Sequence, residues 1–138
     1  MVATAVAEQT HVIGVDVGGT KVLAGVVDEH GHVEHRRERS TDVGSQDKLI
    51  DELAAAVDEL LDDSIAAVGF GLPSRIDHRL GRVDGSVNIP LADVPLLDLM
   101  RERLGVPVGI ENDGNAAALA EFRYGAGRGS DTIVLLTL

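Results

Sequence analysis

The sequence predicts an α/β domain with a mixed sheet, in which antiparallel strands come first and βαβ units follow. Two apolar runs around a Gly-Gly turn, at 12–17 and 22–27, predict an opening β-hairpin. A helical stripe of apolar residues at 46–61 precedes a continuous apolar run at 65–72, which is typical of a buried parallel strand. The length of 138 residues fits one domain with its own core.

The composition excludes several classes of protein. Hydrophobic residues make up 44% of the chain and aromatic residues only 2%, so the core must be aliphatic and stacking platforms for single-stranded nucleic acid are absent. The formal charge of −11 is opposite in sign to that of a phosphate-backbone binder, so we expect no nucleic-acid partner. The absence of cysteine excludes a disulfide framework. Without a signal peptide or a membrane-spanning apolar run, we expect a soluble, cytoplasmic protein with no membrane partner.

The turn of the first hairpin carries residues that suit a binding loop. Asp16 precedes Gly18 and Gly19, and Thr20 and Lys21 follow. Glycines let backbone N–H groups approach a phosphate closely, while threonine adds a hydroxyl donor and lysine a cation. An aspartate here can hold a metal ion, directly or through water. An ordinary turn with charged residues near its tip fits the same pattern, and the local sequence leaves both interpretations open.

The next segment predicts an edge strand and an amphipathic helix. Gly31 suits a turn position with positive φ. The polar and basic run at 33–40 predicts a solvated strand near a sheet edge. Ser45 predicts the N-cap of the helix at 46–61, whose charged face we interpret as solvent-exposed.

The middle of the chain predicts a buried strand followed by loop, helix and strand. Within the run at 65–72, Gly69 and Gly71 indicate that something approaches the backbone near the carboxyl end, where ligands of open α/β sheets bind. The segment at 74–93 predicts mainly loop. A short helix at 96–104 and an apolar strand at 106–110 follow.

An asparagine and an aspartate link that strand to an alanine-rich helix ending near Tyr124. In one interpretation, Asn112 or Asp113 simply caps the helix. In the other, Asp113 lies at the carboxyl end of a strand, where the helix dipole favours the ionised carboxylate for ligand chemistry. The two interpretations are compatible, and the local pattern favours neither.

The last segments predict a turn and a strand. The glycine-rich run at 125–129 follows a helix, so we interpret it as a flexible turn rather than a dinucleotide fingerprint. The apolar run at 132–138 predicts a strand. Because the sequence stops within that run, we expect the chain to be a fragment.

Three widely separated segments together resemble one family. DVGGTK at 16–21, GFGLPSRID at 69–77 and ENDGNAAALAE at 111–121 resemble, in this order, the N-terminal lobe of the ROK family of sugar kinases. The resemblance is closest to the bacterial, actinobacterial-type glucokinases of that family. SVNIPL at 86–91 and FRYGAGRG at 122–129 are similar as well, so the match runs from about position 12 to the last residue.

The resemblance implies an actin-like ATPase or ribonuclease-H-like lobe, with a mixed sheet flanked by helices. Residues 1–10 would be an N-terminal tail and 11–138 the sugar-binding lobe, truncated before the nucleotide-binding lobe. In the family a second phosphate loop and a Cys-rich zinc motif follow, so we expect structural zinc only in that second lobe. We expect this chain alone to be inactive and the full-length protein to be a homo-oligomer.

The resemblance also implies roles for individual residues. The residues expected to bind the nucleotide phosphates form the first loop and its approach: Gly14, Asp16, Gly18, Gly19, Thr20 and Lys21. Asp16 would lie near the magnesium ion. The residues expected to bind the sugar are Gly71, Asn88, Asn112 and Asp113, and Asp113 would be the general base for the C6 hydroxyl.

The implied reaction is ATP-dependent phosphorylation of a hexose at C6, giving glucose 6-phosphate if the sugar is glucose. A carboxylate suits this step because the hydroxyl must lose its proton as the γ-phosphoryl group arrives. Ser74 stands where many relatives have glycine, and Ile89-Pro90 lacks a tryptophan common in relatives, so fructose, mannose and N-acetylhexosamines remain alternative substrates. A sugar-responsive transcriptional regulator is the other alternative, but only about ten residues precede the first strand, too few for a DNA-binding module.

Overall fold

The structure is a computed structural model that describes residues 8–137. Most of the predicted tail at 1–10, and the last residue of the predicted strand at 132–138, lie outside the described residues. The elements, in chain order, are β1 (His11–Val17), β2 (Lys21–Val27), β3 (Val33–Ser40), α1 (Gln46–Asp58), β4 (Ile65–Leu72), β5 (Ser74–Asp77), β6 (Arg82–Ser86), β7 (Ala92–Val94), α2 (Leu96–Leu104), β8 (Val108–Asn112) and α3 (Asp113–Tyr124).

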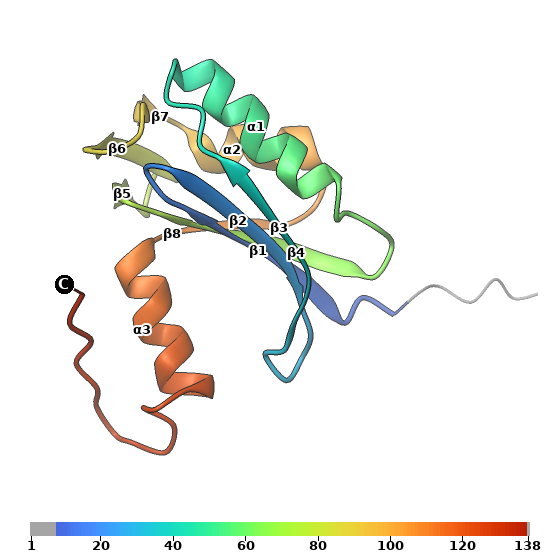
Figure 1. Ribbon diagram of the computed structural model, residues 1–138, viewed down its shortest axis with the longest axis vertical. Helices are drawn as coiled ribbons and strands as arrows, with labels where there is room; N and C mark the ends of the chain where they lie inside the picture. The colour runs from blue at the N-terminus through green and yellow to red at the C-terminus, as the bar shows by residue number, and fades with distance from the viewer. Residues whose placement is uncertain (1–7, 138) are drawn as a thin grey trace, which may run out of the picture.

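The main sheet has five strands in the order β3-β2-β1-β4-β8. The first three strands are antiparallel neighbours, whereas β4 runs parallel to β1 and β8 runs parallel to β4. The predicted mixed sheet is therefore confirmed, with β3 at an edge and almost entirely exposed. Figure 1 shows α1 and α2 together on one face of this sheet and α3 on the opposite side.

The core lies between the main sheet and the pair α1 and α2. Because alternate side chains of a strand face opposite sides, Ile13, Val15 and Val17 of β1 enter the core, while the residues between them face the α3 side. The core is almost entirely aliphatic, as predicted; its largest fully buried side chain, Phe70 of β4, is the aromatic exception. The buried residues from both helices and from the strands form one continuous cluster.

The helices begin where the sequence predicts, with one difference in length. Ser45 caps α1, because its hydroxyl accepts the Lys48 N–H at 3.2 Å. The helix ends at Asp58 instead of 61, since the chain tightens there into a turn that keeps Leu60 in the core. Gly105 ends α2 with a left-handed conformation. In the described part of the chain, no helix has the length and apolarity needed to cross a membrane.

The strand predicted at 106–110 is shifted and forms β8 from Val108 to Asn112. Pro107 has no N–H to give to the ladder, but its carbonyl accepts from the Val68 N–H at 2.9 Å. This shift carries the ladder on to Asn112, so the strand runs directly into α3.

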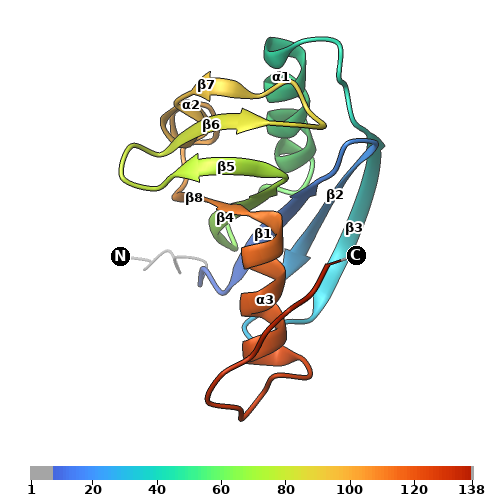
Figure 2. The same cartoon turned by 90° about the vertical axis from the view of Figure 1, so that its left-hand side faces the viewer.

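The segment at 74–93, predicted as loop, instead contains a second small sheet in the order β5-β6-β7. These strands are only three to five residues long, and a register shift interrupts the β5–β6 pairing, so the sequence shows no sustained alternation. Val83 and Val94 face the core, which gives the hairpins a buried side. Figure 2 shows this sheet beside β8, next to the start of α3.

The strand predicted at 132–138 is wrong for the residues that the structure describes. From Thr132 to Thr137 the chain is irregular, and Val134 and Leu136 are each more than 80% exposed. An apolar, β-branched run becomes a strand only when another backbone pairs with it, and between residues 8 and 137 none does.

The two phenylalanines test where the stability of the domain lies. Phe70→Ala empties a fully buried position in the central sheet, so we expect it to lower the free energy of unfolding by about 3–5 kcal/mol. Phe122→Ala removes the same side chain from α3, where it is 37% exposed, and should cost about 1 kcal/mol or less. Urea unfolding of both variants measures the difference. Equal losses would contradict the core described above.

Candidate active site

The carboxyl ends of three neighbouring strands meet at one edge of the main sheet. Asp16 of β1 pairs with Gly71 of β4, and Gly71 pairs with Glu111 of β8. One residue further on, Leu72 pairs with Asn112. Parallel pairing thus brings together residues that lie almost a hundred positions apart in the sequence, and ligands of open α/β sheets bind at this edge.

Asp16 faces away from the core, toward the side on which α3 lies. Its neighbours Val15 and Val17 occupy the core face, so alternation turns its carboxylate outward. Partial burial raises the pKa of Asp16, and the negative charge of Asp113 raises it further. The carboxylates of Asp16, in β1, and Asp113, at the start of α3, are therefore close enough to repel each other.

The turn after β1 has the backbone geometry of a tight hairpin. The Gly18 N–H donates to the Lys21 carbonyl at 2.8 Å, and Thr41 fixes the turn by donating from its hydroxyl to the Gly18 carbonyl at 2.7 Å. Within residues 8–137, the N–H groups of Gly19 and Thr20 donate to no other group. The turn can therefore offer two successive amide donors to an anion.

Two of the residues predicted for the phosphate loop differ from expectation: Gly14 lies outside the turn, and Lys21 has an ion-pair partner. Gly14 lies in the middle of β1, paired with Gly25 on one side and Gly69 on the other, so it is part of the sheet and not of the turn. The Lys21 ammonium lies 3.5 Å from the Glu38 carboxylate of β3, in an exposed ion pair of little energetic weight. Its flexible side chain can leave such a pair for a stronger anion.

Two glycines allow the site segments to approach one another. A Cβ added at Gly19 would lie 3.2 Å from the Cβ of Asn88, so the hairpin turn and the loop after β6 are in contact. A Cβ added at Gly71 would lie 3.8 Å from the Asp113 Cα, which shows that the start of α3 lies over this strand. The predicted sugar-binding residues Gly71, Asn88 and Asp113 are therefore brought to one edge.

The start of α3 holds the asparagine and the aspartate in different ways. Asn112 is the N-cap: its Oδ1 accepts the Asn115 N–H at 3.2 Å, and its Nδ2 donates to the Ser74 carbonyl at 3.2 Å. Asp113 is the first residue of the helix and accepts the Gly114 N–H at 2.8 Å. Each side chain keeps hydrogen-bonding capacity for a ligand, so the capping and binding interpretations are compatible in the structure.

Glu111 and His78 belong to this edge, although the sequence pattern predicts no individual role for either residue. The Glu111 carboxylate accepts the Asn112 N–H at 2.7 Å and the Asn115 side-chain amide at 3.2 Å, and it contacts the His78 ring at 3.1 Å. Partial burial opposes its ionisation, but these three partners outweigh that effect and lower its pKa. The spacing of Glu111 and Asn115 by four residues is a local signal for their contact, whereas His78 is distant in sequence and only the fold reveals it.

The donors at this edge fit a magnesium ion held chiefly by a nucleotide. In the part of the chain that the structure describes, no three histidine, aspartate or glutamate side chains are arranged to hold a metal ion by themselves. Magnesium commonly keeps several waters and takes one or two carboxylates plus substrate phosphates. The ionised form of Asp16 is disfavoured first by partial burial and then by the charge of Asp113, so a bound cation would stabilise this carboxylate.

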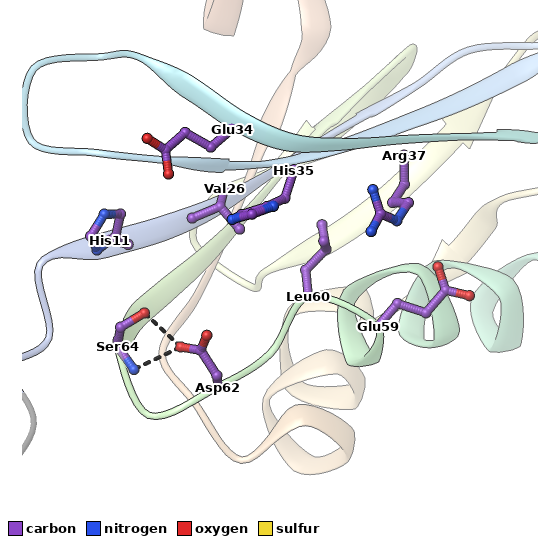
Figure 3. A pocket seen from close by; sticks show the side chains of 9 residues that line it. All are labelled: His11, Val26, Glu34, His35, Arg37, Glu59, Leu60, Asp62 and Ser64. Carbon is purple, nitrogen blue, oxygen red and sulfur yellow. Dashed lines mark hydrogen bonds between the residues drawn. The ribbon is translucent and has the colours of Figure 1, made fainter.

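A separate cavity of about 390 Å³ lies at the opposite end of the sheet. Figure 3 shows His11 and Ser64, near the amino ends of β1 and β4, across this cavity from Glu34 and His35 of β3. Carboxylates, imidazoles and an arginine are mixed around it, with no concentration of one charge. It shares no residue with the edge described above.

The comparisons with known proteins converge on one family. The ROK family signature matches residues 12–138. The chain is 43% identical over 129 residues to the glucokinase of Thermotoga maritima, covering 91% of this chain and 41% of that protein. It is 37% identical over 127 residues to the glucokinase of Streptomyces coelicolor, with 91% and 40% covered.

A solved structure gives the same result. The ROK family glucokinase from Streptomyces griseus, in complex with glucose and AMPPNP, matches with a TM-score of 0.80 and 41% identity, over 88% of this chain and 39% of that one. The chain thus spans about two fifths of the length of these relatives. Its mixed sheet with flanking helices is the actin-like ATPase fold. The ordered motifs, the fold and the family match together establish that the chain belongs to the ROK family.

Proposed function

We propose that the protein carrying this chain is a cytoplasmic carbohydrate kinase that transfers the γ-phosphoryl group of ATP to the C6 hydroxyl of a hexose, with glucose as the substrate. Residues 11–138 supply the sugar-binding lobe and one side of the nucleotide site. One observation carries the proposal: Asp16, which directly precedes the glycine turn, lies close to Asp113 at one edge of the sheet. The glucokinases among its relatives support glucose as the sugar.

In this proposal Asp113 is the catalytic base. Its carboxylate accepts the proton of the C6 hydroxyl while the hydroxyl oxygen bonds to the γ-phosphorus and the bond to the leaving ADP oxygen breaks. Asn88 and Asn112 hold the other hydroxyls, and Gly71 leaves room beside the base. Amide groups suit this task, because a sugar of the wrong stereochemistry leaves them without partners.

The turn at 18–21 holds the phosphates from the other side. The amides of Gly19 and Thr20 and the Lys21 ammonium are the donors for phosphate oxygens. Asp16 holds the magnesium ion that accompanies ATP. When bound, this ion supplies charge neutralisation at the phosphates. Close contact between Gly19 and Asn88 brings phosphate donors and sugar donors side by side.

Removing the base tests the catalytic assignment. In the full-length protein, Asp113→Asn keeps the size of the side chain and should lower kcat by about 10²–10⁴-fold with little change in melting temperature. Asp98→Asn is the matched control, because Asp98 also lies in the first turn of a helix but is exposed and distant from the site edge. Steady-state kinetics of both variants decides the point, and near-normal turnover of Asp113→Asn would remove Asp113 from this role.

Asp16 should show a trade-off between stability and activity. Its raised pKa means that ionisation at neutral pH costs stability, and this cost disappears in acid, where the carboxyls are protonated. Asp16→Asn should therefore raise the free energy of unfolding of the ligand-free protein at pH 7 by up to about 1 kcal/mol, with the gain lost toward pH 3.

The same variant should lower kcat/KM for MgATP by about 10- to 100-fold. Urea unfolding at both pH values and a magnesium titration of activity measure the two effects; a variant less stable at pH 7 would contradict the stated electrostatics.

A substrate panel tests the choice of sugar and donor. We expect the full-length protein to phosphorylate glucose with a higher kcat/KM than mannose, fructose, N-acetylglucosamine or N-acetylmannosamine, and to use ATP in preference to polyphosphate. A coupled assay of ADP release, with mass spectrometry of the sugar phosphate, gives the ranking. Preference for another hexose would replace glucose in the proposal, whereas binding of a sugar without turnover would favour the regulator alternative.

A further inference from the structure

Ser74 is a buried polar residue at the junction between the two sheets. It is 6% exposed, and among the described residues it is the one buried polar side chain. Its hydroxyl lies 2.5 Å from the hydroxyl of Ser86, its partner in the β5–β6 ladder. A buried hydroxyl without a partner is costly, so the two serines satisfy each other. The pair therefore joins β5 to β6 at the end nearest the site.

The backbone of the same residue is joined to the start of α3. The Ser74 carbonyl accepts a hydrogen bond from Nδ2 of Asn112 at 3.2 Å. This bond orients the Asn112 side chain, whose Oδ1 is used to cap the helix. One residue thus contacts both the hairpin of the small sheet and the asparagine at the carboxyl end of β8.

The loop that carries Asn88 begins directly after Ser86. Val87 is 96% exposed and Asn88 is exposed, whereas Ile89 is 5% exposed and anchored in the core. The loop is therefore held on one side by the Ser74–Ser86 pair and on the other by Ile89. A shift of Ser86 would move Asn88 against Gly19, with which it is already in close contact.

We propose that Ser74 is a positioning residue that fixes the distance between Asn88 and Asn112, and that it thereby sets which hexose the protein accepts. The proposal rests on the proposed function, in which these two asparagines hold sugar hydroxyls. Discrimination between epimers requires that two separate amides keep a fixed spacing, because one hydroxyl in the wrong place must leave one amide unpaired. The Ser74 carbonyl accepts directly from the Asn112 amide, whereas its hydroxyl reaches Asn88 only through Ser86, two residues before Asn88 in the chain.

The test uses the full-length protein with Ser74→Ala and Ser86→Ala. Each variant removes the hydroxyl pair, and Ser86→Ala does so from a half-buried position where the fold tolerates it better. We expect either variant to raise the KM for glucose by about three- to tenfold, and to lower the selectivity for glucose over mannose by a similar factor. The KM for ATP should stay within about twofold. The double variant should be no worse than either single variant, because both remove one interaction.

Two further variants separate positioning from simple stabilisation. Ser64→Ala is the matched control: its hydroxyl also makes a 2.5 Å bond, to Asp62, at the opposite end of the sheet. It should leave both KM values and the selectivity unchanged. Ser74→Thr restores a hydroxyl and should recover most of the selectivity lost in Ser74→Ala.

The outcomes distinguish this proposal from the proposed function. If the wild-type protein phosphorylates a hexose but Ser74→Ala and Ser86→Ala change only the melting temperature, or if Ser64→Ala raises the sugar KM equally, Ser74 has no positioning role. If the wild-type protein neither phosphorylates nor binds any hexose by calorimetry, the proposed function fails and the Ser74 proposal fails with it. Raised sugar KM with unchanged ATP KM supports both.

Discussion

Three parallel strands, β1, β4 and β8, end side by side, and their register places Asp16, Gly71 and Glu111 in one row across the sheet. The hydrogen-bonded ladder holds this row in place, because a slip of one residue would turn each side chain to the other face. Such a slip of β1 would bury Asp16 in the aliphatic core and expose both Val15 and Val17. The core therefore fixes the position of the site, since the same alternation that buries the valines turns the aspartate outward.

The site edge combines an electrostatic cost with a dense set of hydrogen bonds. Asp16 and Asp113 repel each other, which raises the pKa of Asp16 after partial burial has already done so. Nearby, Glu111 is stabilised in its ionised form by the Asn112 N–H, the Asn115 amide and His78. Perturbed carboxylates at the carboxyl ends of parallel strands are typical of functional sites. In the proposed reaction, a magnesium ion would relieve the repulsion between Asp16 and Asp113. The hydrogen bonds of Glu111 keep Asn112 and the start of α3 in place.

Helix α3 depends on its first turn more than on packing. None of its residues is fully buried, and Leu119 and Tyr124 are more than half exposed. Its alanine-rich sequence has high intrinsic helix propensity, and Asn112 caps its first amides. Contacts with β4 and β8 hold it against the sheet. The start of the helix, which bears Asp113, is consequently the best-anchored part of an otherwise exposed element.

The sequence by itself determined the elements whose signals are local: the hairpin around Gly18 and Gly19, the Ser45 cap, the buried strand at 65–72 and the stop of α2 at Gly105. The ordered motifs also determined the family and the residues to expect at the site. Only the tertiary structure decided that residues 74–94 form a second sheet. Strands as short as those that pair Ser74 with Ser86 leave no periodic pattern in the sequence. The tertiary structure alone decided that the apolar run after Asp131 is unpaired within residues 8–137, since a strand needs a partner that its own sequence does not specify. The same holds for the contacts of His78 with Glu111 and of Ser74 with Asn112, which join residues more than thirty positions apart and exist only because β5 packs beside β8.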